Sequence, residues 1–136
     1  MSVYEVTSSL SDQEWQINNQ ARQHNFVCDD IHEDGSDAGP NPVEYLTGAV
    51  NSCITMSTGM VIKSRQLPIK NFHLNTTVTT KDLGHSRSIV ESMTIEVGMT
   101  TDLSTEEQQK FVDHVLDVST VYQTVKKAVA ITVKLI

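Results

Sequence analysis

Basic and aromatic residues are scarce in this sequence. Its 136 residues include 10 lysines and arginines against 17 aspartates and glutamates, which gives a formal net charge of −7. Nucleic-acid binding needs a basic face that neutralises phosphates, so this balance argues against it. The negative charge also argues against an anionic membrane surface as a partner. With one Trp, three Tyr and three Phe, the core has to be built from aliphatic side chains.

Long apolar runs and a disulfide framework are missing as well. No run of about 18 apolar residues could span a membrane. The first residues lack the basic and apolar regions of a signal peptide, so we expect a cytoplasmic protein. Two cysteines, Cys28 and Cys53, are too few for the framework of a small secreted domain. The length predicts a single domain over residues 1–136.

The first part of the chain alternates polar and apolar residues. This period of two predicts an antiparallel meander of strands over residues 1–28, with alternation from residue 3 and over 14–18, and a less regular alternation over 21–28. Residues 29–41 are rich in Asp, Gly and Pro and predict a loop.

A long helix is expected next. Asn41 is a favourable N-cap, Pro42 suits the first helical position and Glu44 completes a capping box. Helical spacing continues to about Arg65, so we expect the longest element here, central and largely buried. Its apolar stripe is formed by Leu46, Ala49, Val50, Cys53, Met56 and Met60.

The remaining elements complete an α+β order, β-β-β-α-β-β-α-α-β. They are strands over 69–80 and 88–100 joined by a turn at 81–85, a helix after a capping box at 104–107, a short helix after a break near Ser119, and a final strand over 130–135.

The two thiols are the first candidates for chemistry. Cys53 lies in the middle of the long helix, and its position alone fits either a buried core cysteine or a reactive thiol. Cys28 is followed by Asp29 and Asp30, whose carboxylates disfavour a thiolate, so packing is the favoured role.

A metal site is not expected. Asp30, His32, Asp34 and Gly35 faintly match a calcium-binding loop, but the closing Glu is missing because Asn41 stands there, so a solvated loop is favoured. The five histidines lack the paired spacing of a zinc site.

Two stretches carry a family resemblance. The run Gly-Pro-Asn-Pro-Val-Glu-Tyr-Leu at 39–46, with Ser-Cys at 52–53, resembles the OsmC/Ohr family, and so does the closing run at 127–132. The resemblance covers residues 26–132. It implies an OsmC-like α+β fold, with antiparallel sheets around a long central helix, in an intertwined homodimer. Many members are thiol-dependent hydroperoxide reductases that act in oxidative-stress defence.

The resemblance also assigns roles to single residues. Cys53 falls on the position of the attacking thiol, which becomes a sulfenic acid. Ser119 stands where the second cysteine is expected, and Val43 stands where the peroxidases carry a Glu that orients an Arg. Glu44 lies on the face of the helix opposite Cys53 and is better interpreted as the capping acid. Arg22, the only basic residue among the first 60, is the candidate assisting Arg.

Three hypotheses follow from these assignments. The first is a one-cysteine hydroperoxide reductase that needs no cofactor beyond an external thiol, with Cys28 as an internal alternative for resolution. The second is a non-catalytic protein that binds a small hydrophobic ligand at the dimer interface. Its candidate pocket is lined by Met56, Met60, Ser119 and Tyr122. The third is a purely structural Cys53.

Overall fold

The structure is a computed structural model that describes residues 1–136. It divides into two compact units, Met1–Leu46 and Thr47–Ile136, which we describe separately. The single domain expected from the length stays a prediction. No helix combines the length and the apolar character that a membrane span requires.

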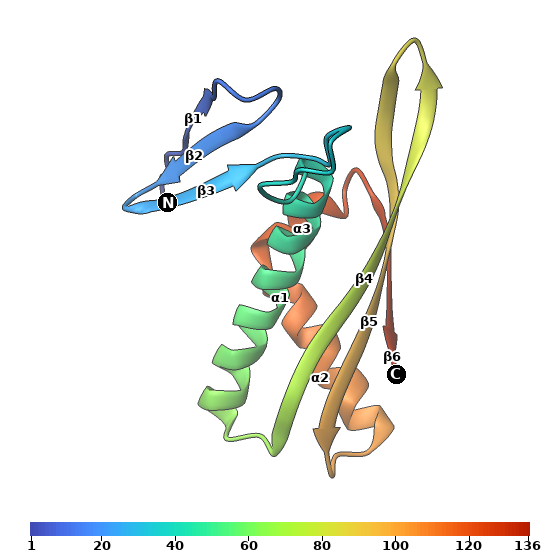
Figure 1. Ribbon diagram of the computed structural model, residues 1–136. Helices are drawn as coiled ribbons and strands as arrows, with labels where there is room; N and C mark the ends of the chain where they lie inside the picture. Colours follow the sequence, from blue (N-terminus) through green and yellow to red (C-terminus); the bar gives the residue numbers. More distant parts are fainter. The chain divides into compact units, whose positions relative to one another are not determined.

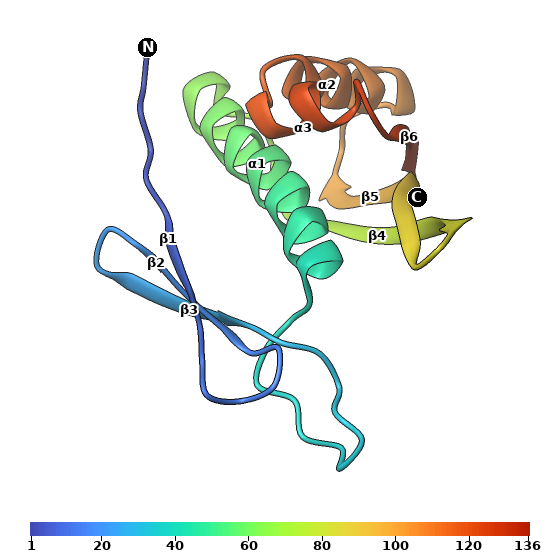
Figure 2. The same cartoon turned by 90° about the horizontal axis from the view of Figure 1, so that it is seen from above.

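The first unit contains the expected antiparallel meander. Its strands are β1 (Thr7–Leu10), β2 (Ile17–Ala21) and β3 (His24–Cys28), paired in that order and coloured blue in Figure 2. The prediction of a strand from residue 3 is wrong, because β1 begins at Thr7 opposite Gln20. Only one further residue of β2 follows before its turn, so the residues preceding Thr7 find no strand to pair with.

Helix α1 (Pro42–Arg65) begins where the capping signals predict. The Asn41 side chain accepts a hydrogen bond from the Glu44 N–H at 3.0 Å, and the Glu44 carboxylate accepts one from the Asn41 N–H at 2.9 Å. These reciprocal bonds satisfy two backbone donors at the helix start. The reading of Glu44 as the capping acid is thereby confirmed.

The buried face of α1 differs from the predicted stripe. Within the second unit, the helix buries Val50, Ile54, Thr58 and Val61. Met56 and Met60 lie outside this stripe and are 70% and 68% exposed. The expectation of a largely buried helix is therefore wrong for the single chain. The helix has apolar side chains on two faces, and the chain's own core covers only one of them.

The sheet of the second unit is a long hairpin joined by a third strand. Strands β4 (Ile69–Gly84) and β5 (Arg87–Thr101) are antiparallel, and their ribbons rise far above the rest of the unit (Figure 1). The turn lies at His85 and Ser86, whose φ angles of 55° and 59° are typical of a two-residue hairpin turn. It falls at the end of the segment expected at 81–85 and one residue beyond it.

Strand β6 (Ala130–Leu135) runs parallel to β5. The expected purely antiparallel arrangement is therefore corrected for this sheet. Helices α2 (Thr105–Asp117) and α3 (Thr120–Val125) carry the chain back along β5, so β6 starts opposite Ser92 and runs in the same direction. The Ser104–Glu107 capping box is present at the start of α2, as predicted.

The core of the second unit lies between this sheet and the helices. Alternate residues of β5 point to the helices and are buried, and α2 contributes a matching apolar stripe. Phe72 of β4 and Phe111 of α2 form an edge-to-face pair with centroids 6.4 Å apart. The other core residues of β5 and α2 are Met93, Ile95, Val97, Val112 and Val115.

Candidate functional site

Cys53 lies on α1 at the start of α3. Its side chain is partly accessible, and its Sγ accepts a hydrogen bond from the backbone N–H of Val121 at 3.4 Å. Val121 is the second residue of α3, a position whose N–H has no partner inside its own helix. The sulfur therefore satisfies a donor that the N-cap side chain usually satisfies.

Ser119, the N-cap of α3, explains why this N–H is left for the sulfur. Its Oγ makes no capping hydrogen bond and instead donates to the Val115 carbonyl of α2 at 2.7 Å. Ser119 is completely buried. The structure thus brings Cys53 to the helix start that follows Ser119, the position where the resemblance places a second cysteine.

The four residues of the candidate pocket differ in their exposure. Met56 and Met60 are exposed on α1, whereas Ser119 and Tyr122 are buried. Burial, and secondarily the Asp113 carboxylate, raise the pKa of the Tyr122 hydroxyl. A shallow pocket of about 480 Å³ beside α1 includes only Met56 of this set. Its other lining residues are Asn51, Ser52, Thr55 and Leu74.

Arg22 and Cys28 belong to the first unit. Arg22 lies in the two-residue turn between β2 and β3, with a φ of 56°, and its side chain is exposed. Cys28 ends β3, is buried and is a free thiol, as is Cys53. Burial, and then the charges of Asp29 and Asp30, raise the pKa of Cys28, which keeps it neutral and weakly nucleophilic. The assisting role of Arg22 and the resolving role of Cys28 stay predictions.

The Gly-Pro-Asn-Pro run has a structural role at the end of β3. Gly39 packs so closely on Val27 that an added Cβ would collide with the Val27 carbonyl oxygen. The Pro40 carbonyl accepts a hydrogen bond from the Asp29 N–H at 3.1 Å, and the Tyr45 hydroxyl donates to the Val27 carbonyl. The run thus fastens the start of α1 to β3.

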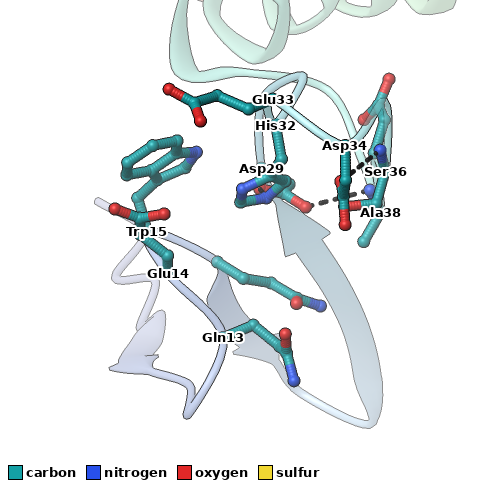
Figure 3. A pocket seen from close by; sticks show the side chains of 11 residues that line it. Gln13, Glu14, Trp15, Asp29, His32, Glu33, Asp34, Ser36 and Ala38 are labelled. Carbon is teal, nitrogen blue, oxygen red and sulfur yellow. Dashed lines mark hydrogen bonds and ion pairs between the residues drawn. The ribbon is translucent and has the colours of Figure 1, made fainter.

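Sequence reasoning missed a second site, a pocket of about 630 Å³ in the first unit. Figure 3 shows Trp15 on one side of it and His32 within it. The signal was present as a tryptophan in one loop and an acidic run in another. Only the strand pairing shows that these loops meet.

Comparison with known proteins gives the family. The model of the OsmC-like protein family matches residues 34–134, so the chain belongs to this family. No curated protein matches the sequence.

Solved structures agree on the fold. An OsmC-like protein from Mycoplasma pneumoniae is similar with a TM-score of 0.88 and 14% identity, over 99% of this chain and 96% of that one. An OsmC-like protein of unknown function from Vibrio cholerae is similar with a TM-score of 0.83 and 9% identity, over 100% of both chains. The organic hydroperoxide resistance protein OhrB of Bacillus subtilis is similar with a TM-score of 0.73 and 15% identity, over 99% and 98% of the two chains. At these identities the similarity establishes the α+β OsmC-like fold.

Proposed function

We propose that this protein is a one-cysteine, thiol-dependent organic hydroperoxide reductase in which Cys53 is the attacking thiol. The observation that carries the proposal is the Val121 N–H aimed at a partly accessible Sγ. A backbone N–H at a helix start favours negative charge on the group that it contacts. The family and its hydroperoxide-resistance members supply the reaction class.

The reaction has three balanced steps. The Cys53 thiolate attacks one oxygen of the peroxide, the O–O bond breaks, and the leaving alkoxide takes a proton to become an alcohol. The sulfur is now a sulfenic acid. A thiol condenses with it, releases water and leaves a mixed disulfide, and a second thiol displaces Cys53 as thiolate.

The source of the resolving thiol follows from Ser119. Its hydroxyl cannot form a disulfide, so an external low-molecular-weight thiol resolves the sulfenic acid in this proposal. Cys28 is the internal alternative, although its raised pKa makes it a poor nucleophile. An external thiol supply fits a reducing compartment such as the cytoplasm.

The proposal includes a homodimer. We call the exposed α1 residues Gly48, Ala49, Ser52, Thr55, Met56, Gly59 and Met60 the outer α1 face. This face combines two exposed methionines with small residues, and such an apolar surface is typical of a protein contact. Beside Gly48 and Gly59 of this face there is open space. Val3, Tyr4, Val6 and Leu10 of the first unit are exposed too, between 59% and 88%.

The test compares Cys53→Ser with the matched control Cys28→Ser. Consumption of an organic hydroperoxide is measured with a small dithiol as reductant, and sulfenic acid is trapped and located by mass spectrometry. We expect Cys53→Ser to abolish turnover and trapping, and Cys28→Ser to retain both. Equal activity of wild type and Cys53→Ser would refute the proposal. Loss of turnover in Cys28→Ser with trapping at Cys53 retained would make Cys28 the resolving thiol.

The second candidate is a protein that binds a small apolar ligand and performs no redox chemistry. It is favoured by the exposed, flexible Met56 and Met60, since methionine surfaces adapt to varied apolar partners. The absence of a Glu at Val43 points the same way. An apolar molecule that co-purifies with the protein, together with an unreactive Cys53, would favour this candidate.

A further inference from the structure

The pocket of the first unit is built by two loops that the meander brings together. Ile17, at the start of β2, pairs with Cys28, at the end of β3. The loop before β2 and the loop after β3 therefore leave the same edge of the sheet. The first contributes residues 13–16 and the second residues 29–38, and they enclose about 630 Å³, a volume in the range of small-molecule sites.

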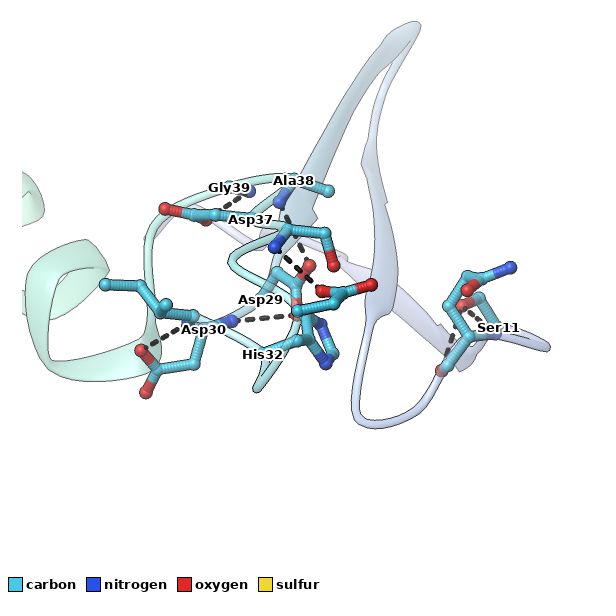
Figure 4. Close-up of polar contacts among 11 residues, drawn as sticks. Ser11, Asp29, Asp30, His32, Asp37, Ala38 and Gly39 are labelled. Carbon is cyan, nitrogen blue, oxygen red and sulfur yellow. Dashed lines mark hydrogen bonds and ion pairs between the residues drawn. The ribbon is translucent and has the colours of Figure 1, made fainter.

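An aromatic pair forms a fixed wall of this pocket. The rings of Trp15 and His32 stack with centroids 5.0 Å apart and an angle of 4° between their planes. His32 Nε2 lies 2.7 Å from an oxygen of Asp29, which is 3% exposed. Asp29 also accepts hydrogen bonds from the N–H groups of Asp30 at 2.8 Å and Ala38 at 3.0 Å (Figure 4).

These contacts keep Asp29 ionised. Burial by itself would raise its pKa, but the hydrogen bonds from Asp30, Ala38 and His32 outweigh burial and hold the pKa below its ordinary value. An ionised carboxylate only accepts, so the Nε2 proton is on His32. The imidazole plane, and the indole stacked on it, are thereby held in place.

The wall is surrounded by negative charge that the first unit leaves uncompensated. Glu14 and Glu33 line the pocket near Trp15 (Figure 3) and form no hydrogen bond or ion pair within the chain. Asp34 and Asp37 line it as well, and no Lys or Arg does. Residues 1–46 contain nine acidic residues and one basic residue, Arg22, whereas residues 47–136 contain eight and nine.

A metal ion does not suit this arrangement. The carboxylates and the imidazole do not converge as a group of three or more metal-ligating side chains. Two carboxylates without internal partners beside a half-exposed indole instead suit a cation with a flat face. A guanidinium group donates paired hydrogen bonds to carboxylates and stacks on aromatic rings, so it matches both features.

We propose that this pocket binds a small organic cation of the guanidinium class, stacked on Trp15 and neutralised by Glu14 and Glu33. The site is independent of Cys53 and of the peroxidase proposal. The ligand is recognised by charge and shape together. Its neutral urea isostere has the same outline but lacks the positive charge.

The test uses Trp15 as a reporter, since it is the only tryptophan of the chain. Butylguanidinium is titrated into the full-length protein and followed by indole fluorescence, with butylurea as the neutral control. We expect a saturable change with butylguanidinium that weakens as salt is added, and no saturable change with butylurea. Equal responses to both compounds would overturn the proposal.

Variants locate the site. Glu14→Gln with Glu33→Gln removes the two carboxylates without cutting any hydrogen bond, and we expect the dissociation constant to rise at least fivefold. The matched control is Asp102→Asn with Asp117→Asn, two exposed carboxylates of the other unit that form no hydrogen bond or ion pair, so it changes the net charge equally. An unchanged dissociation constant in the first variant, or an equal rise in the control, would overturn the proposal. Circular dichroism verifies that both variants are folded.

Discussion

The dimer proposal predicts that the outer α1 face drives association while contributing little to folding. Met56 and Met60 are 70% and 68% exposed in the single chain, so truncating them leaves the core intact. Fully burying a Met side chain contributes about 1.5–3 kcal/mol. Part of each side chain is already covered in the single chain and Ala keeps its Cβ, so truncation to Ala removes about 1–1.5 kcal/mol of this energy. Because a twofold interface counts each residue twice, one substitution costs about 2–3 kcal/mol of association.

This magnitude makes the test decisive. A loss of about 2–3 kcal/mol raises the dissociation constant about 30- to 150-fold, and the double variant Met56→Ala, Met60→Ala raises it about a thousandfold or more. Analytical ultracentrifugation over nanomolar to micromolar concentrations measures it. The control is Ile89→Ala, which truncates a 48% exposed side chain of β5 outside the outer α1 face. A monomeric wild type, or equal dissociation of the control, would refute the reasoning.

Three further predictions concern stability. Gly39→Ala should lower the melting temperature because its Cβ would strike the Val27 carbonyl; a melting temperature equal to that of the wild type would contradict this. Ile54→Ala, which empties a 2% exposed core site, should cost about 2–5 kcal/mol in a urea titration, and a cost below about 1 kcal/mol would show that α1 is not packed as described. The raised pKa of Cys28 means that the folded chain holds the thiol proton more tightly than the unfolded chain does. The contribution of Cys28 to the free energy of unfolding is therefore fully present below the ordinary pKa of 9.0, and it is lost as the pH rises through the raised value. Chemical denaturation between pH 8 and 10 should show this loss in the wild type, and Cys28→Ser should remove it.

Local signals were the part of the fold that sequence could predict. The caps at Asn41 and Ser104 depend on hydrogen bonds between residues three apart, and both are present. Strand and helix types follow from periodicities within one element. These features need no knowledge of which segments meet.

Features set by distant segments escaped prediction. Either apolar face of α1 could have been its core face, and only the packing of the second unit selects Val50, Ile54 and Val61 over Met56 and Met60. The parallel direction of β6 depends on where α3 delivers the chain. The acidic pocket depends on the pairing of β2 with β3, which neither loop encodes on its own.

The geometry at Cys53 indicates what a serine at position 119 changes. Its buried Oγ donates a hydrogen bond to the Val115 carbonyl, so it does not cap α3. The Val121 N–H is thereby left to the Cys53 sulfur. A hydroxyl also cannot form a disulfide. A serine at position 119 therefore allows no disulfide with Cys53, whereas the contact between the Val121 N–H and the Cys53 sulfur is present. In the proposed reaction, the first oxidation step stays with the protein and the resolving step passes to the external thiol, so turnover should depend on the concentration of that thiol.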